Sequence, residues 1–507
     1  MKHNSGPFGP QNSIFYGAIL LTLGSIVIRF VQMVFQIYIS GIMGAAGLGR
    51  MQLIMAVGGL ASVIASGGVR IAATCLAAEE AGRDSAAGVR SAIRCCCLYG
   101  GLLSTLAAAA LYLLSHLLSA HWIDDPSAAL PLRLFALGLP LNCLWSVLAG
   151  YYTAASRITE LVLLEFAERL GSIGLVILLL RTNPGASDPC AAVILGSTLA
   201  TLVSFLILLE RYYRSISQTA PSPLRPMMGR LLRLTLPLGC NDILRSGLGT
   251  LEQILVPQGL RKSGSSGPQS LASSGTICGM VFPVITFPSV ILYSLSDLLV
   301  PEMARSRAKG WQPRILFLTE KCLRLTMLFA AATAGLCFLL GDDLGMLLFG
   351  SRDAGIYLRI FAPLILILYI DTITDGMLKG LSQQLHSVRY NTFTSLLDVL
   401  LIYLLLPRCG IRGFLIAFTL SHGVNFFLSL RRLILVTGYL PRFRATLTAS
   451  GCCVLCLLLF RHWPGAGLGG VFLRGCCFLL SYLLLIRLTG ALKAEDLRWL
   501  RSLVAGH

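Results

Sequence analysis

Charge is scarce in this chain of 507 residues. Only 13% of the residues are Asp, Glu, Lys or Arg, and 55% are hydrophobic. About 25% charged residues is usual for a soluble protein. The mean hydropathy is +0.76. A water-soluble enzyme of this length could not cover its surface with so few charges, so we expect most of the surface to face lipid.

Acidic residues are scarcer than basic ones, with 23 Asp and Glu against 41 Lys and Arg, which gives a net charge of +18. In a membrane protein such an excess marks cytoplasmic loops rather than nucleic-acid binding. The seven His are scattered, and no Walker loop, GxSxG or HExxH motif is present. We therefore expect no enzyme, no cofactor and no nucleic-acid partner. The acidic pairs Asp124-Asp125 and Asp342-Asp343 leave a lipid-dependent glycosyltransferase as a minor alternative.

Cysteine, in contrast, is plentiful, with sixteen residues. Most of them lie inside apolar runs, where a thiol behaves as a small hydrophobic group. Cys453 and Cys456 have the CxxC spacing, but no third or fourth ligand accompanies them. We therefore predict no metal site from the cysteines.

Long hydrophobic runs fill the sequence. A spanning helix needs roughly 20 apolar residues, and no gap between the runs is long enough for a soluble domain. The runs cover 14–40, 50–77, 95–119, 130–154, 159–181, 190–210, 232–257, 274–300, 314–340, 354–378, 387–407, 411–430, 444–460 and 469–489. They predict an all-α integral membrane protein with about fourteen transmembrane helices.

The basic residues set the expected orientation. With the N-terminus inside, 24 of the 41 Lys and Arg fall on the inside, 9 on the outside and 8 within spans. This bias predicts a multi-pass protein of the cell (plasma) membrane with both termini in the cytoplasm. The predicted divisions are an N-terminal tail (1–13), an N-lobe of spans 1–6 (14–210), a cytoplasmic linker (211–231), a C-lobe of spans 7–12 (232–435), spans 13–14 (436–489) and a C-terminal tail (490–507).

An internal echo also favours two halves. Pro140 opens an apolar helix that is followed by a short polar turn and a second helix with membrane charges, and Pro363 opens the same series. Parallel repeats of this kind are common in transporters.

Polar residues recur on one face of the first span. Ser25, Arg29, Gln32, Gln36 and Ser40 follow spacings of 4, 3, 4 and 4, which places them on one side of a helix. Because charges inside a membrane are costly, this stripe is predicted to line a water-filled or substrate-filled cavity. Hydrogen bonding between helices is the alternative.

Two more spans of the N-terminal half carry charges. Arg70 follows Gly67 and Gly68, which allow close packing or local unwinding. It is predicted either to contact substrate or to pair with a carboxylate of a neighbouring helix. Glu165 and Arg169 are spaced i, i+4, which favours an internal ion pair.

The seventh span carries Asp242, Arg245 and Glu252 on one side of a helix. A cation flanked by two carboxylates could hold an anion in one state and be neutralised internally in another. A permanently satisfied network is the alternative.

Acidic and amide residues recur in the tenth and eleventh spans. Asp371 and Asp375 lie one turn apart, and Asn391 and Asp398 share a helical face with Ser395. These residues could couple transport to an ion or bind the hydroxyls of a sugar.

Together these linings predict an anionic, hydroxyl-rich ligand. The planar guanidinium of arginine makes two charge-assisted bonds to a phosphate. We therefore assign Arg29, Arg70 and Arg245 to a pyrophosphate. The sugar contacts are assigned to Gln32, Gln36 and Asn391.

Several stretches together resemble one family. They are Gly44-Ala-Ala-Gly47-Leu-Gly49 after the first span, Val256-Pro257 through Gly264, Phe287-Pro288, Leu299-Val300-Pro301, Lys379-Gly380-Leu381-Ser-Gln-Gln, Leu406-Pro407 through Gly413, and Asn425. In order and spacing they resemble the stage V sporulation protein B family. That family belongs to the superfamily of polysaccharide, lipid-linked oligosaccharide and multidrug exporters and is related to lipid II flippases. The resemblance covers about residues 13–435.

The resemblance implies two six-helix lobes around a central cavity, with a pseudo-two-fold repeat, and two further C-terminal helices. It implies outward flipping of an undecaprenyl-pyrophosphate-linked oligosaccharide or peptidoglycan precursor by alternating access, for the spore cortex or another envelope polysaccharide. Arg29 matches a first-span arginine of the family, Glu165 and Arg169 match a Glu-x-x-x-Arg, and Glu252 stands where an acid is expected. The expected partners are that lipid precursor, membrane lipids and a coupling cation, with the protein acting as a monomer. A cation-coupled multidrug exporter and a non-transporting envelope scaffold are the alternatives.

Overall fold

The apolar runs form helices, because a backbone surrounded by lipid has to satisfy its hydrogen bonds within the segment. The computed structural model describes residues 11–155, 157–182, 188–215, 224–439, 443–463, 467–492 and 495–496. Within these ranges every regular element is a helix. Most of the two predicted tails and much of the predicted linker lie outside the described residues, as does the side chain of Ser25.

The described chain divides into two units that do not follow simple chain order. Unit 2 comprises Ala46–Gln258, and unit 1 contains the described residues before Ala46 and from Gly259 onward. The first part of α1 (Gln11–Ser66) therefore groups with the C-terminal half of the chain, and most of α7 (Leu224–Lys262) groups with the N-terminal half. The lobes predicted from sequence place these two helices the other way round and stay a prediction.

Unit 2 is a bundle built around α4, which packs against α2, α3 and α6. Its elements after α1 are α2 (Val69–Gly82), α3 (Ala86–Leu118), the short helices η1 (Ser119–Ile123) and η2 (Pro126–Ala128), α4 (Ala129–Ala154), α5 (Ile158–Thr182), α6 (Pro189–Ser215) and α7.

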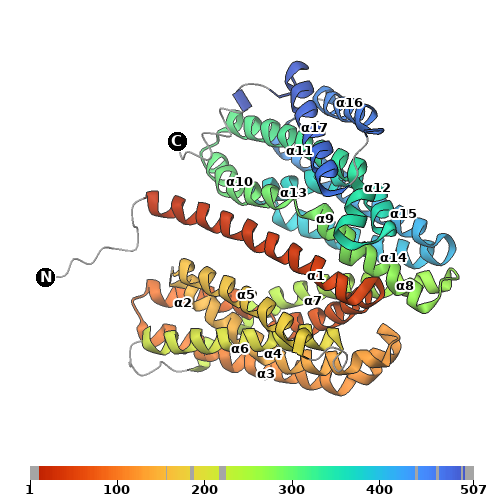
Figure 1. Cartoon of the computed structure of the whole chain (residues 1–507). Helices are drawn as coiled ribbons and strands as arrows, with labels where there is room; N and C mark the ends of the chain where they lie inside the picture. Colours follow the sequence, from red (N-terminus) through yellow and green to blue (C-terminus); the bar gives the residue numbers. More distant parts are fainter. Residues whose placement is uncertain are drawn as a thin grey trace. The chain divides into compact units, whose positions relative to one another are not determined.

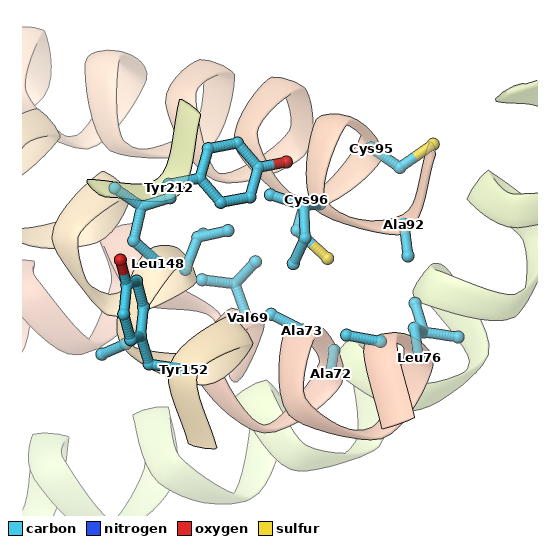
Figure 2. Packing of buried hydrophobic residues seen from close by; sticks show 14 of the residues in the cluster. Val69, Ala72, Ala73, Leu76, Ala92, Cys95, Cys96, Leu148, Tyr152 and Tyr212 are labelled. Atoms are coloured by element: carbon cyan, nitrogen blue, oxygen red, sulfur yellow. The ribbon is translucent and has the colours of Figure 1, made fainter. Parts of the chain in front are cut away.

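The core of unit 2 joins α2 to α3, α4 and α6. Figure 2 shows Val69, Ala72, Ala73 and Leu76 of α2 directed toward the same interior as Cys96 of α3. Small side chains let the helices approach closely, which is the usual way for spans to associate in lipid. The cysteines of this core are free, as expected for small apolar groups.

Glycine interrupts the second predicted span where α7 packs against it. Gly67 and Gly68 have φ values of 46° and 73°, in the left-handed region that favours glycine. A Cβ at Gly68 would lie 3.1 Å from the Cβ of Leu238 on α7. The glycines before Arg70 thus provide both the unwinding and the close packing that the sequence suggested.

Unit 1 holds the remaining helices together with the first part of α1. They are α8 (Gly267–Ser274), the π-helix η3 (Gly275–Val281), α9 (Phe282–Thr286), α10 (Val290–Ala308), α11 (Gln312–Phe349), α12 (Arg352–Phe361), α13 (Leu364–Gly380), α14 (Gln384–Cys409), α15 (Ile411–Thr437), α16 (Phe443–Phe460) and α17 (Gly467–Leu488). Two of its spans are bent, by 57° between α9 and α10 and by 58° between α12 and α13. Pro288 and Pro363 lie at the two bends, where proline prevents a continuous helix.

The last two helices pack on α11 (Figure 1). Arg474 of α17 donates to the carbonyls of Phe460 and Arg461 at 3.1 and 3.0 Å, and to Asp343 of α11 at 3.2 Å. Near the opposite end of α11, Lys321 and Arg324 both pair with the buried Asp496. Ion pairs thus fasten this C-terminal segment near both ends of α11.

Among the described residues, eight helices are long and apolar enough to cross a membrane, or up to ten if each bent pair is one span. The segment Ile26–Gly82, which includes most of α1 and all of α2, counts as one of these eight spans. Gly44 nevertheless interrupts α1, because its backbone has φ 67° and ψ 178°. Helices α5 and α7 carry more charge than such spans usually do, and the described apolar part of α16 is short. The count of about fourteen stays a prediction.

Candidate functional site

The polar stripe on α1 contacts the bent span of unit 1. Gln36 donates from its amide to the carbonyl of Gly279 in η3 at 3.0 Å. The guanidinium carbon of Arg29 lies 5.1 Å from the ring centre of Tyr293 on α10, while Arg29 and Gln32 are exposed. The amide of Gln36 is therefore used in a hydrogen bond to a backbone carbonyl of the π-helix η3. The side chains of Arg29 and Gln32, in contrast, are accessible to a ligand.

The acids of α13 lie in a hydrogen-bonded network with α14 and α15. Asn425 donates to Asp371 at 2.8 Å, and Thr394 donates to the other end of the Asn425 amide at 3.4 Å. The second carboxylate oxygen of Asp371 is buried and has no hydrogen-bond partner among the residues that the structure describes. A buried acceptor in this state is costly, so it marks a position where a cation or proton would be stabilised.

The neighbouring residues of that network are satisfied. Asp375 accepts from Ser387 and pairs with Lys379 at 2.7 Å, while Asn391 donates to Ser387 at 3.4 Å. Ser387 thus links Asp375 to Asn391 in the structure, while the roles assigned to Asp371, Asp375 and Asn391 stay predictions.

Further along α14, Ser421 of α15 donates to the buried Asp398 at 2.6 Å. Ser387, Thr394 and Ser421 were not singled out from the sequence, because hydroxyl side chains are common in spans. Their role emerges only when the three helices are packed.

Arg70 of unit 2 pairs with a carboxylate from a neighbouring helix. Its guanidinium lies 3.4 Å from Glu165 on α5 and 5.8 Å from the ring centre of Trp145 on α4. Trp145 in turn donates from its indole nitrogen to Ser204 of α6 at 2.9 Å. Glu165 was expected to pair with Arg169, one turn along the same helix. In the structure Glu165 pairs with Arg70 of α2 instead.

The charged residues of α7 do not form a closed network among themselves. Asp242 and Arg245 are exposed, and within the described chain neither is held in an ion pair. Glu252 is half-buried and is engaged in an interaction with another residue. Arg245 is thus available to an anion at the surface of unit 2.

Three acids of the two acidic pairs at the predicted outer ends of the spans, Asp125, Asp342 and Asp343, pair with arginines. Arg50 binds Asp125 at 3.4 Å, Ser127 at 2.6 Å and also Asp188. Burial raises the pKa of Asp125, but hydrogen bonds from Ser127 and the charge of Arg50 outweigh it, so the pKa lies below its ordinary value.

In unit 1 the corresponding acids are paired too, Asp342 with Arg359 at 2.6 Å and Asp343 with Arg474. No three His, Cys, Asp or Glu side chains in the described ranges are grouped to hold a metal ion. Asp125, Asp342 and Asp343 are therefore accounted for as members of ion pairs near helix ends.

Comparison with known families places the chain. The family model described as polysaccharide biosynthesis protein matches residues 14–267, just over half of the sequence. The chain belongs to this family. It is 22% identical to stage V sporulation protein B of Bacillus subtilis (strain 168) over 414 residues, which are 80% of each chain. The family resemblance carried by the motifs is thereby confirmed.

Solved structures of similar fold are membrane transporters. The lipid II flippase MurJ in an inward closed conformation matches with a TM-score of 0.70 and 14% identity, over 93% of this chain and 98% of that one. An inward-facing multidrug resistance transporter of the MATE family and MOP superfamily matches with a TM-score of 0.65 and 13% identity, over 82% and 99%. The predicted class, an all-α multi-pass membrane protein, is confirmed.

Proposed function

We propose that this polysaccharide biosynthesis family member is a flippase. It carries an undecaprenyl-pyrophosphate-linked oligosaccharide or peptidoglycan precursor outward across the plasma membrane by alternating access. The spore cortex or another envelope polysaccharide is the proposed destination. We propose further that it acts as a monomer with both termini in the cytoplasm. Similarity to a sporulation protein and the fold shared with a lipid II flippase support this proposal.

The observation that carries the proposal is a set of accessible arginines within the spans. Arg29 and Arg245 are exposed, and 48% of the Arg70 side chain is exposed. A charge placed in lipid is costly, so such side chains face water or a polar ligand. A pyrophosphate satisfies arginines through paired hydrogen bonds, whereas a hydrophobic cation would be repelled by them.

Asp371 supports coupling to a cation. Its carboxylate accepts a hydrogen bond from the amide of Asn425, whose oxygen accepts from Thr394, and a hard cation prefers carboxylate, amide and hydroxyl oxygens as ligands. A cation moving down its gradient would bind at Asp371. Its binding can drive transport only if two conformations of the protein differ in their affinity for that cation.

The test is transfer of a labelled lipid-linked precursor by the purified protein in vesicles. We expect transfer well above that of empty vesicles, and loss of transfer in Arg29→Ala with an unchanged melting temperature. Equal rates in protein-containing and empty vesicles would refute the flippase. Full activity of Arg29→Ala would remove the phosphate role of that residue.

A cation-coupled multidrug exporter is the second candidate, favoured by the acids of α13 and by the fold shared with the MATE transporter. It predicts efflux of cationic dyes that depends on Asp371 and tolerates loss of Arg29. Dye efflux from cells expressing either variant separates the two functions.

A further inference from the structure

The packing of α2 fixes where Arg70 points. Val69, Ala72, Ala73 and Leu76 are buried at i, i+3, i+4 and i+7, so they form the core face of the helix (Figure 2). Arg70 lies about 100° around the helix from Val69 and is exposed. The direction of the Arg70 side chain is thus set by the buried face of α2, which is packed into the core.

Arg70 lies about three helical turns from the charged end of α2. That end, predicted to lie inside, is marked by Glu80, which pairs with Arg230 and Arg83. Ten residues separate Arg70 from Glu80, a rise of roughly 15 Å along a helix. This is about half the thickness of the hydrocarbon core.

Three side chains from three helices meet at this depth. Besides the contacts of Arg70 with Glu165 and Trp145, the indole of Trp145 is oriented by its hydrogen bond to Ser204. The Glu165 side chain is 35% exposed and that of Arg70 is 48% exposed. Because lipid would not tolerate a half-exposed ion pair at this depth, this face of unit 2 borders an aqueous space.

We propose that Trp145, Glu165 and Arg70 form a sugar-binding subsite for the first pyranose ring of the lipid-linked ligand. This inference rests on the proposed function and assigns a recognition role to Trp145 and Glu165, for which the flippase proposal by itself has no need. The ligand class is a pyranose ring joined to a lipid through a pyrophosphate.

The chemistry of the three groups is complementary to such a ring. The face of an indole is negatively polarised and packs against cations or against the slightly positive C–H hydrogens of a sugar. A carboxylate only accepts hydrogen bonds and is matched by sugar hydroxyls. In the structure Arg70 engages both of these partners, contacting the ring of Trp145 and pairing with Glu165.

Ligand binding then becomes an exchange of partners. The guanidinium of Arg70 turns to the pyrophosphate, with which it makes stronger paired bonds than with Glu165 at 3.4 Å. This movement frees the indole face and the carboxylate for the sugar. Every polar group keeps a partner in both states, so the charged side chains need not be left unpaired within the membrane.

The experiment compares two lipids on the full-length protein in detergent. The probes are undecaprenyl pyrophosphate and undecaprenyl pyrophosphate bearing one N-acetylhexosamine. We expect the wild type to bind the glycosylated lipid about ten-fold more tightly than the bare one. Trp145→Leu and Glu165→Gln are expected to lose most of that ratio while keeping their affinity for the bare lipid. Arg70→Ala is expected to weaken binding of both.

Two matched variants control for folding. Trp145→Phe keeps an aromatic face and is expected to retain part of the ratio. Trp122→Leu alters a tryptophan in η1 and is expected to leave both affinities unchanged. An unchanged ratio in Trp145→Leu would overturn the subsite and leave the flippase intact. Failure of the wild type to bind either lipid would overturn both proposals.

Discussion

The two units treat charge within the membrane in different ways. In unit 1 the acids of α13 and α14 accept hydrogen bonds from α14 and α15, and one oxygen of Asp371 is buried without a partner. In unit 2 the charge of Arg70 is half-exposed and, within the described part of the chain, contacts Glu165 and the ring of Trp145. A buried acceptor suits a small cation, whereas an exposed, loosely held arginine suits a large anion. On the proposed function, unit 1 supplies both Asp371 for coupling and Arg29 for the cargo, and unit 2 supplies Arg70 for the cargo.

The largest effect is expected from Arg70→Ala. Removing the guanidinium takes away the proposed phosphate ligand and leaves Glu165 without its partner. A lost hydrogen bond to a charged group costs about 1.5–3 kcal/mol, so transfer of the lipid precursor should fall by about 100-fold. Arg181→Ala, at the exposed end of α5, is the matched control and should transfer at the wild-type rate. Equal losses of transfer in Arg70→Ala and Arg181→Ala would mean that transfer depends on the total positive charge of unit 2 and not on Arg70 in particular.

A smaller effect is expected from Asp371→Asn in unit 1. The substitution keeps the shape but removes the charge that would hold a cation. Transport driven by a cation gradient should fall by about ten-fold, while binding of the lipid precursor in detergent stays as in the wild type. Asp353→Asn, at the exposed start of α12, is the control. If Asp371→Asn abolished lipid binding instead, Asp371 would act in cargo recognition rather than in coupling.

Gly44→Ala tests the point where α1 passes from one unit to the other. Gly44 has φ 67°, and no atom lies within 4 Å of the place that a Cβ would take, so the cost is backbone strain alone. At ψ 178° this backbone region is almost exclusive to glycine, so we expect a loss of about 1–3 kcal/mol, measured as a lower melting temperature. Gly41→Ala, which has equal space and helical φ, should be neutral or stabilising. Equal melting temperatures would show that the break tolerates a side chain.

The smallest effect concerns Asp125 at the predicted outer end of unit 2. Its folded pKa lies below the unfolded value of about 3.9. The stability it contributes is therefore present above that value and is lost as the pH falls through the folded pKa. Asp125→Asn should lose about 1 kcal/mol at pH 7 and match the wild type at the acidic limit. A difference that persists unchanged in acid would exclude the carboxylate as its source.

The sequence predicted features that lie along one helix better than those that join helices. Helical spacing alone placed Asp371 and Asp375 on one face of α13, and the glycines before Arg70 predicted a break. The sequence suggested that Arg70 could pair with a carboxylate of a neighbouring helix but did not identify Glu165. Glu165 lies 95 residues from Arg70, and the basic residue nearest to Glu165 in the sequence is Arg169. Spacing within a helix carries no information about which neighbour packs against it.

The π-helix η3 had no sequence signal either. Gln36 was assigned to a sugar, but its amide binds the carbonyl of Gly279 because that backbone is irregular. The grouping of α1 with the C-terminal half was likewise not predicted, because hydropathy finds spans without showing which of them pack together.

That grouping has a consequence for biosynthesis. Gln36 and Gly279 lie 243 residues apart. At a synthesis rate of about 5–20 residues per second, the first part of α1 waits roughly 12–50 s for its partner to emerge. During this interval Arg29 has neither Tyr293 nor a completed bundle around it. The contacts of the first part of α1 with η3 and α10 can therefore form only late in synthesis, after most of the chain has been made.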